Sequence, residues 1–336
     1  MPRVLGIAIV LGCFAGNVML HAADPNEVVL IIHGGTAPAR ARLSAEREQA
    51  MRAVMAEALQ AGRAALEREG ADPLDGVAAA IVVLEDSPLF NAGRGAVFTA
   101  DERIELDASI MSGRDRRAGA VAGVRTVKNP IRAARAVMEK SPHVLLIGEG
   151  AERFCQGVGL EIVDPAYFRT EERLQELRRL KTAEEQGGAS LREDAESREW
   201  STVGAVALGA DGRITAGTST GGMVNKRHGR VGDSPIIGAG TYADDRTCGV
   251  SCTGHGEYFI RLAIAHTVSD LVRYKDYDVQ QAVDEAIGGE LKTAGGTGGV
   301  IVLDPRGRAA FAYNTPGLWR GTITRDGRIT VAVYED

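Results

Sequence analysis

The chain contains 336 residues, 42 of them glycine, and its formal net charge at pH 7 is −6. Hydrophobic residues make up 44% of the sequence and charged residues 25%, which excludes wholesale disorder, collagen and a multi-span membrane protein. The net acidic charge, without any block rich in Lys and Arg, argues against nucleic-acid binding. The length allows two domains or one large domain.

Residues 1–23 have the pattern of a secretory signal peptide. Arg3 precedes a nearly unbroken apolar run over residues 4–20, and two small residues, Ala22 and Ala23, follow it. The run lacks a stop-transfer flank, so the sequence predicts a periplasmic or secreted protein and no membrane span. Cys13 loosely matches a lipoprotein cleavage site, which leaves a lipid-anchored form as the alternative.

Hydrophobic periodicity predicts alternating strands and helices in the first half of the chain. Asp72 and Pro73 suit the start of a helix, because Pro has no N–H to leave unpaired in a first turn. In chain order, we expect a strand at 28–32, helices at 43–69 and 72–84, a glycine-containing loop at 88–95, strands at 104–111 and 118–124, a helix after residue 130 and a strand at 143–147.

The composition changes over residues 170–201, which are rich in Glu and Arg and contain a Gly-Gly-Ala-Ser stretch. This predicts a flexible, solvated linker whose first part is compatible with a helix. Asp211-Gly212 beyond it indicates a hairpin. The remaining predicted elements are strands at 202–208, 213–218, 250–253, 300–303, 309–313, 322–324 and 329–333, and helices at 257–274 and 279–291. Together they favour an α+β layered sandwich.

The segment from Thr202 to Asp245 is the densest in glycine, hydroxyl and charged residues. Glycines beside hydroxyls indicate close backbone approach to a ligand, or simply a set of tight hairpin turns. Arg230 and Asp233 could bind opposite charges on a substrate, or form a salt-bridged pair within a hairpin. Spacing alone leaves both pairs of alternatives open.

Residues 217–221, Gly-Thr-Ser-Thr-Gly, match the G-x-S-x-G pattern of serine hydrolases. That pattern needs a strand before it and a helix after it. A strand is predicted before it, but residues 222–229 are too rich in glycine to start a helix. A serine hydrolase that uses Ser219 as its nucleophile is therefore a disfavoured alternative.

Several motifs in the same order resemble the plant-type asparaginase/isoaspartyl peptidase family of N-terminal-nucleophile hydrolases. The resemblance covers about residues 27–334. The matching motifs are Asn-Ala-Gly at 91–93, Thr-Val-Gly-Ala-Val-Ala-Leu at 202–208, Thr-Ser-Thr-Gly-Gly-Met at 218–223, Gly-Arg-Val-Gly-Asp-Ser-Pro at 229–235, Cys-Thr-Gly-His-Gly-Glu at 252–257 and Gly-Gly-Thr-Gly-Gly at 295–299.

The resemblance implies autocleavage between Ser201 and Thr202. The products would be an α subunit, residues 24–201, and a β subunit, residues 202–336, in a four-layer αββα sandwich that associates as an (αβ)2 homodimer. The new α-amine of Thr202, with an ordinary pKa of about 7.7–8.0, would act as the base for its own hydroxyl. Ser201 departs from the Gly common at this position in the family, which puts the cleavage rate in question.

The resemblance also implies the other site residues. Arg230 would bind the substrate carboxylate and Asp233 its ammonium, with Thr253 and Gly254 as the oxyanion hole. The remaining roles fall to Gly256, which frames the carboxylate pocket, Thr220, which orients the nucleophile, and Asn91, which supports it. No catalytic cofactor is implied. A structural Na⁺ would bind backbone carbonyls of Leu84, Glu85, Ser87, Phe90, Ala92 and Arg94.

The expected activity is hydrolysis of β-aspartyl dipeptides and L-asparagine, releasing L-aspartate. One alternative is a glycosylasparaginase, but Gly221-Gly222-Met223 replaces the Asn-Gly usual in those relatives. A second alternative is an uncleaved periplasmic protein that binds aspartyl compounds without hydrolysing them, for which Ser201 is the only support.

Overall fold

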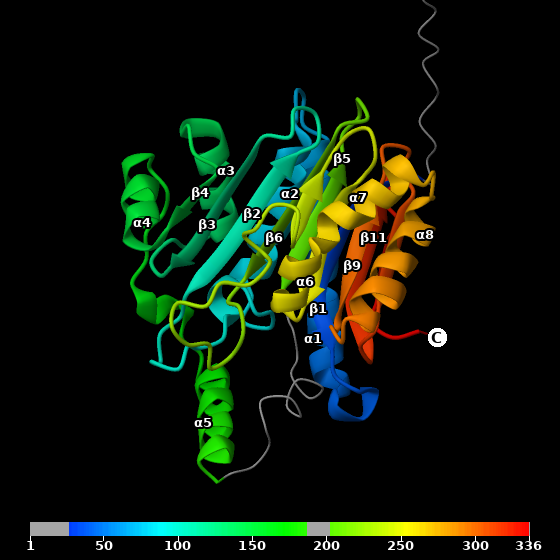
Figure 1. Ribbon diagram of the computed structural model, residues 1–336. Helices are drawn as coiled ribbons and strands as arrows, with labels where there is room; N and C mark the ends of the chain where they lie inside the picture. The colour runs from blue at the N-terminus through cyan, green and yellow to red at the C-terminus, as the bar shows by residue number, and fades with distance from the viewer. Residues whose placement is uncertain (1–26, 187–201, 336) are drawn as a thin grey trace, which may run out of the picture.

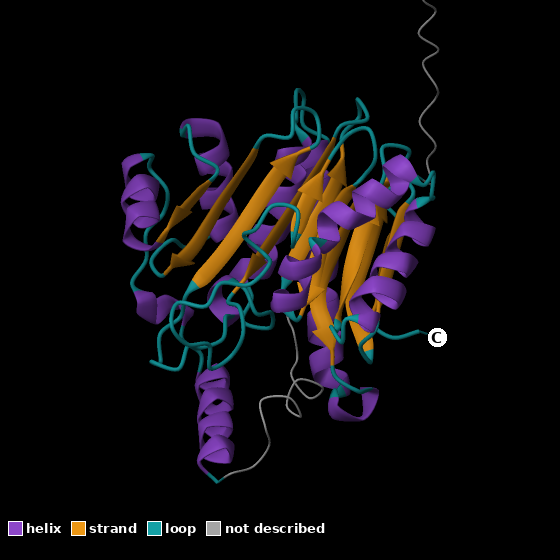
Figure 2. Ribbon diagram, in the orientation of Figure 1, coloured by secondary structure: helices purple, strands orange, loops and turns teal. Residues whose placement is uncertain are grey.

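The computed structural model describes residues 27–186 and 202–335 (Figures 1 and 2). Its strands are β1 (Val28–Ala37), β2 (Leu106–Ser112), β3 (Ala118–Val124), β4 (Leu145–Ile147), β5 (Val203–Leu208), β6 (Ile214–Thr220), β7 (Thr241–Ala243), β8 (Gly249–Gly254), β9 (Gly298–Leu303), β10 (Ala309–Tyr313), β11 (Gly317–Thr324) and β12 (Ile329–Ala332). Its α-helices are α1 (Ala45–Leu66), α2 (Pro73–Asp86), α3 (Pro130–Lys140), α4 (Gly148–Gly157), α5 (Glu171–Glu185), α6 (Gly256–Leu262), α7 (Ile264–Tyr274) and α8 (Val279–Asp284). Short helices are η1 (Arg40–Arg42), η2 (Gly93–Gly95), η3 (Pro165–Phe168) and the π-helical η5 (Glu285–Leu291).

The described strands form two sheets, so the protein is a mixed α+β structure. The eight-stranded sheet has the order β12-β11-β1-β5-β6-β2-β3-β4, and the four-stranded sheet has the order β10-β9-β8-β7. Neighbouring strands are antiparallel except β3 and β4. The predicted strand pair after residue 202 is the β5–β6 hairpin at the centre of the larger sheet.

The larger sheet is buried on both faces because alternate side chains of its strands enter different hydrophobic clusters. In β5, Val203, Ala205 and Ala207 join the cluster that contains α1, α2 and α3, whereas Val206 and Leu208 join the cluster formed with the four-stranded sheet, α7 and α8. Figure 2 shows the helices and strands in this arrangement. Residues of β5 and β6 therefore face either α2 or the smaller sheet, depending on their position.

The predicted starts of α1 and α2 are confirmed by their caps. The Ser44 hydroxyl accepts a hydrogen bond from the N–H of Arg47, and Asp72 forms a capping box with Asp75 ahead of Pro73. These local signals depend on neighbouring residues only. Sequence therefore places both helix starts to within two residues.

The single helix predicted over 257–274 is wrong. Ala263 has a φ of +47° and separates α6 from α7. The N–H groups of Ala265 and His266 bind the carbonyls of Ala239 and Gly238, 3.2 and 2.9 Å away. The Ala265 N–H is thus bonded outside the helix, whereas that of His266 is shared with the carbonyl of Ala263, 2.9 Å away, and the helix restarts after Ala263. The predicted helix at 279–291 likewise changes to a π-helix at residue 285.

The segment predicted as a linker, 170–201, is a helix over its first half. Thr170 caps α5, and Leu177 and Arg173 are buried against the body of the protein. Figure 1 shows α5 extending away from the sheets. Residues 187–201, including Ser201, lie outside the described residues, as do residues 1–23 with Cys13.

None of the described helices is both long enough and apolar enough to span a membrane.

Candidate active site

Thr202 and Thr220 are brought together by the register of the central hairpin. Val203 pairs with Ser219, which places Thr202 opposite Thr220 at the open end of β5 and β6. Their hydroxyl oxygens are 3.1 Å apart, and both residues are buried. The N–H of Gly222 donates to the same Thr220 oxygen over 3.0 Å. The Thr220 hydroxyl therefore lies within hydrogen-bond distance of the Thr202 hydroxyl.

Asn91 reaches this site from the loop after α2. Its amide nitrogen donates to the carbonyl of Gly222 over 2.7 Å, and its side-chain oxygen accepts from the N–H of Val97 over 3.0 Å. A Cβ on Gly221 would lie 2.5 Å from that oxygen, so the position requires glycine. Asn91 thus fixes the turn that follows Thr220.

Thr253 and Gly254 approach Thr202 from the smaller sheet. The backbone nitrogen of Thr202 lies 3.4 Å from the hydroxyl oxygen of Thr253. Gly254 has a φ of +150°, and a Cβ there would lie 2.4 Å from the carbonyl oxygen of Thr297. The two sheets therefore meet at Thr202, and Thr253 and Gly254 lie at the end of the facing strand, β8.

Ser219 lies on the opposite face of β6. Its side chain is buried and donates to Glu85 over 2.7 Å, within the cluster formed by α2. Burial raises the pKa of Glu85 to about 8, against the opposing effect of the Ser219 hydrogen bond. Because Ser219 points away from Thr202, the structure argues against a serine hydrolase elbow here.

Arg230 lies beside Glu257, a residue that sequence reasoning did not assign to the site. The Nε and Nη2 atoms of Arg230 donate to the two carboxylate oxygens of Glu257, each over 2.9 Å. Burial alone would lower the pKa of Arg230, but the hydrogen bonds and charge of Glu257 raise it. Arg230 is thus a fixed cation, and its ion-pair partner is Glu257 rather than Asp233.

Asp233 is buried close to this ion pair. Burial raises its pKa to about 7, with the Arg230 charge opposing the rise and the charges of Glu257 and Asp107 adding to it. Its Oδ2 atom accepts no hydrogen bond from the described residues. A Cβ on Gly256 would lie 2.8 Å from Asp233 Oδ1 and 2.9 Å from Arg230 Nη2, so Gly256 packs against both side chains.

A buried chain of polar side chains lies between the two sheets behind Thr202. His33 Nε2 is 2.9 Å from the hydroxyl of Ser251, which is 2.7 Å from that of Thr218. Burial lowers the pKa of His33 to about 3, so the imidazole is neutral. A Cβ on Gly204 would lie 2.0 Å from the Ser251 oxygen, which explains the glycine two residues after Thr202. The sequence alone does not show this contact, because His33 and Ser251 are 218 residues apart.

The loop after α2 packs its glycines tightly against its own backbone carbonyls. A Cβ on Gly93 would lie 2.3 Å from the carbonyl oxygen of Glu85, and one on Gly95 would lie 2.1 Å from that of Phe90. Within the described ranges, no cluster of three His, Cys, Asp or Glu side chains could hold a metal ion. A cation in this loop would therefore have carbonyl ligands.

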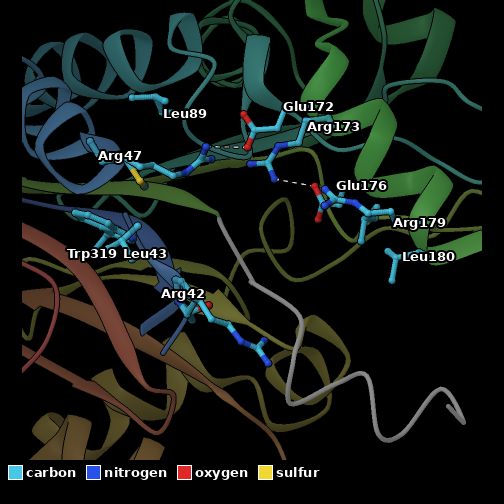
Figure 3. A pocket seen from close by; sticks show the side chains of 14 residues that line it. Arg42, Leu43, Arg47, Leu89, Glu172, Arg173, Glu176, Arg179, Leu180 and Trp319 are labelled. Atoms are coloured by element: carbon cyan, nitrogen blue, oxygen red, sulfur yellow. Dashed lines mark hydrogen bonds and ion pairs between the residues drawn. The ribbon is translucent and has the colours of Figure 1, made fainter. Parts of the chain in front are cut away.

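A cavity of about 490 Å³ lies elsewhere, between η1, α1 and α5 (Figure 3). An ion pair between Arg47 and Glu172 joins α1 to α5 beside it, Arg173 and Glu176 form a second pair within α5, and Trp319 also lines it. None of the predicted catalytic or substrate-binding residues lines it. The cavity is thus separate from the candidate site.

Known proteins match this chain along almost its entire length. The sequence matches the asparaginase family over residues 26–333, and the chain belongs to that family. It is 44% identical to the "Isoaspartyl peptidase" of Escherichia coli K12, with 92% of this chain and 97% of that protein covered. It is 41% identical to the "Probable isoaspartyl peptidase/L-asparaginase 2" of Arabidopsis thaliana (91% and 98% covered) and 46% identical to the "Plant-type L-asparaginase" of Pyrococcus abyssi (86% and 93% covered).

Proposed function

We propose that this protein is a threonine hydrolase that cleaves β-aspartyl dipeptides and L-asparagine to release L-aspartate. One observation carries the proposal. The Thr202 hydroxyl lies 3.1 Å from Thr220, and its backbone nitrogen lies beside Thr253 on the facing sheet. The relatives named as isoaspartyl peptidases and asparaginases support the same reaction.

The activating step is proposed as self-cleavage between Ser201 and Thr202. The Thr202 hydroxyl attacks the carbonyl of residue 201, the peptide C–N bond breaks, and water hydrolyses the resulting ester. The products are residues 24–201 and 202–336, whose two sheets and flanking helices form a four-layer αββα sandwich. Two such protomers associate as (αβ)2.

In the cleaved protein the freed α-amine of Thr202 takes the proton of its own hydroxyl. The oxygen then attacks the β-carbonyl carbon of the substrate, and the Thr253 hydroxyl and Gly254 N–H bind the developing oxyanion. The leaving amine or ammonia takes the proton from the Thr202 ammonium as the C–N bond breaks. Water, with the same amine as base, releases L-aspartate from the ester.

Arg230 and Asp233 select the aspartyl part of the substrate. Arg230 binds the α-carboxylate and Asp233 accepts the α-ammonium. Because burial raises the pKa of Asp233 to about 7, the carboxylate form needed for this contact is gained as the pH rises toward neutrality. Thr202, Thr220 and Asn91 complete the site.

We propose a structural Na⁺ at the loop that carries Asn91. The close approach of Gly93 to the Glu85 carbonyl and of Gly95 to the Phe90 carbonyl supports it, because the loop is compact around its own carbonyl oxygens. The ligands would be the backbone oxygens of Leu84, Glu85, Ser87, Phe90, Ala92 and Arg94. A bound ion would brace the loop and take no part in the reaction, and no catalytic cofactor is proposed.

Export to the periplasm is proposed from residues 1–23, with lipidation at Cys13 as the alternative. The mature N-terminus distinguishes the two, because signal peptidase cleavage after residue 23 leaves a free protein whereas lipidation leaves an acylated cysteine. Mass spectrometry of soluble and membrane fractions measures which form is present.

The function is tested by incubating the purified protein at neutral pH and measuring its intact mass, its N-terminal sequences and its hydrolysis of a β-aspartyl dipeptide and L-asparagine. We expect two chains, one beginning at Thr202, with activity that appears as the cut fraction grows. Thr202→Ala should stay uncut and inactive. A wild-type chain that remains uncut for days and still binds L-aspartate would refute the hydrolase and favour a binding protein.

A further inference from the structure

A buried pair of opposite charges lies behind the substrate-binding residues. The side chain of Lys226 is 1% exposed and that of Asp107 is 0% exposed. Lys226 Nζ donates to the backbone carbonyl of Glu105 over 3.0 Å and lies 3.9 Å from both Asp107 Oδ2 and a carboxylate oxygen of Glu105. Charges this deeply buried need a partner, because desolvation costs several kcal/mol for an isolated ion.

This pair is adjacent to the nucleophile. Asp107 on β2 pairs directly with Thr220 on β6. Its Oδ1 atom accepts from the N–H of Gly123 over 2.8 Å, whereas Oδ2 accepts no hydrogen bond from the described residues and faces Lys226. Asp107 is therefore a carboxylate that depends on Lys226 for compensation, at the strand position beside the residue that holds Thr202.

Lys226 also contacts the turn that organises the site. A Cβ on Gly222 would lie 3.1 Å from Lys226 Nζ and 3.5 Å from Arg230 Nη1, so both cations flank the same glycine. The N–H of Gly222 binds Thr220 and its carbonyl binds Asn91. A substitution of Lys226 would thus alter the position of Gly222 and, through it, affect both the nucleophile and the Arg230 side chain.

The charges that face Asp233 are those of Arg230, Glu257 and Asp107, with the buried Cys252 thiol also close. The negative charge of Asp107 raises the pKa of Asp233, whereas a positive charge on Lys226 opposes that of Asp107. An uncompensated Asp107 would also oppose a substrate carboxylate approaching Arg230. Lys226 therefore affects both proposed substrate contacts, that of Arg230 with the carboxylate and that of Asp233 with the ammonium.

We propose that Lys226, paired with Asp107, is a positioning residue that fixes Gly222 and keeps the charge of Asp107 from weakening the Arg230–Asp233 site. This inference rests on the proposed function, in which Arg230 and Asp233 bind the aspartyl group. It assigns a role in substrate binding to two side chains that do not touch the substrate.

The test compares Lys226→Met, Asp107→Asn and the double variant with the wild type, as full-length protein. Calorimetric titration with L-aspartate between pH 5 and 9 measures the affinity, and hydrolysis of a β-aspartyl dipeptide measures kcat and KM. Intact mass gives the cut fraction and thermal unfolding gives the Tm.

Lys226→Met should weaken aspartate binding and raise KM at least tenfold, with a smaller effect on kcat. It should shift the loss of aspartate affinity at acidic pH (the acidic limb) to higher pH, because without the Lys226 charge the repulsion between the Asp107 and Asp233 carboxylates is less opposed and protonation is favoured. Asp107→Asn should shift this acidic decline in aspartate binding to lower pH. The double variant removes both buried charges together, so it should fold. The pH dependence of its aspartate binding should lie close to that of the wild type.

Shifts in the same direction for both single variants, or no shift in any folded variant, would overturn the proposal. If the Lys226–Asp107 pair only stabilised the fold, both single variants would have a lower Tm, and the pH dependence of their aspartate binding would not shift in opposite directions. If the wild type hydrolyses the dipeptide but the variants do not shift, the inference about Lys226 fails and the proposed function stands. If the wild type neither binds aspartate nor hydrolyses the dipeptide, the proposed function itself fails.

Discussion

Replacing Thr220 with Val tests the central contact of the proposed site. Valine has nearly the shape of threonine, so the substitution removes a hydroxyl and leaves the packing of β6 in place. Two hydrogen bonds disappear, the 3.1 Å contact with the Thr202 hydroxyl and the 3.0 Å bond from the Gly222 N–H. Thr202 is buried, and Gly222 is partly buried.

The expected loss follows from the energies of such bonds. One hydrogen bond is worth about 1 kcal/mol net, and a buried donor left without a partner costs about 1–3 kcal/mol. Together the two effects amount to about 2–4 kcal/mol of transition-state stabilisation. At about 1.4 kcal/mol per factor of ten, kcat/KM should fall about 30- to 700-fold.

The assay measures hydrolysis of a β-aspartyl dipeptide per cut molecule, with the cut fraction determined by intact mass, so that slow maturation is not counted as slow catalysis. Thr220→Ser keeps the hydroxyl and should retain most activity. Ser219→Ala removes the neighbouring hydroxyl on the other face of β6 and should leave kcat/KM within about threefold. A fully cut Thr220→Val enzyme with wild-type kcat/KM would refute the role assigned to Thr220.

Two further predictions concern burial near the site. Gly256→Ala places a methyl group 2.8 Å from Asp233 Oδ1 and 2.9 Å from Arg230 Nη2, so KM should rise at least tenfold in steady-state assays, and an unchanged KM would contradict the proposed binding geometry. Glu85 keeps its proton in the folded protein up to a pKa of about 8 but loses it near 4.5 when unfolded, so its contribution to the free energy of unfolding falls as the pH rises between these values. Glu85→Gln should therefore gain Tm relative to the wild type from pH 5 to pH 8, and a constant difference across this range would show that Glu85 does not titrate as described.

Sequence predicted the elements whose signals are local. The caps at Ser44 and Asp72 lie next to the helices they start, and the Asp211-Gly212 turn lies between the strands it joins. The break at Ala263 was missed because its cause is distant in sequence, in hydrogen bonds from α7 to the carbonyls of Gly238 and Ala239. No pattern within residues 257–274 reports that contact.

The same distinction applies to the site. The resemblance named Thr202, Thr220 and Asn91, and the structure brings them together. Glu257 was missed because nothing in the sequence distinguishes it from an ordinary acidic residue after Gly256. Only the fold shows that its carboxylate accepts two hydrogen bonds from Arg230. Lys226 was missed for the same reason, since the sequence does not show that its ammonium group is buried.

The contact between Glu257 and Arg230 determines how a substrate carboxylate can bind. Glu257 takes the Nε and Nη2 donors, so the edge formed by Nη1 and Nη2 is the one left for the substrate. Cβ atoms on Gly222, Gly232 and Gly256 would lie 3.5, 2.9 and 2.9 Å from these two nitrogens. Any side chain at these positions would cover that edge. Access to the guanidinium group therefore explains Gly232 and Gly256, whereas Gly222, with a φ of +79°, is also required by its turn.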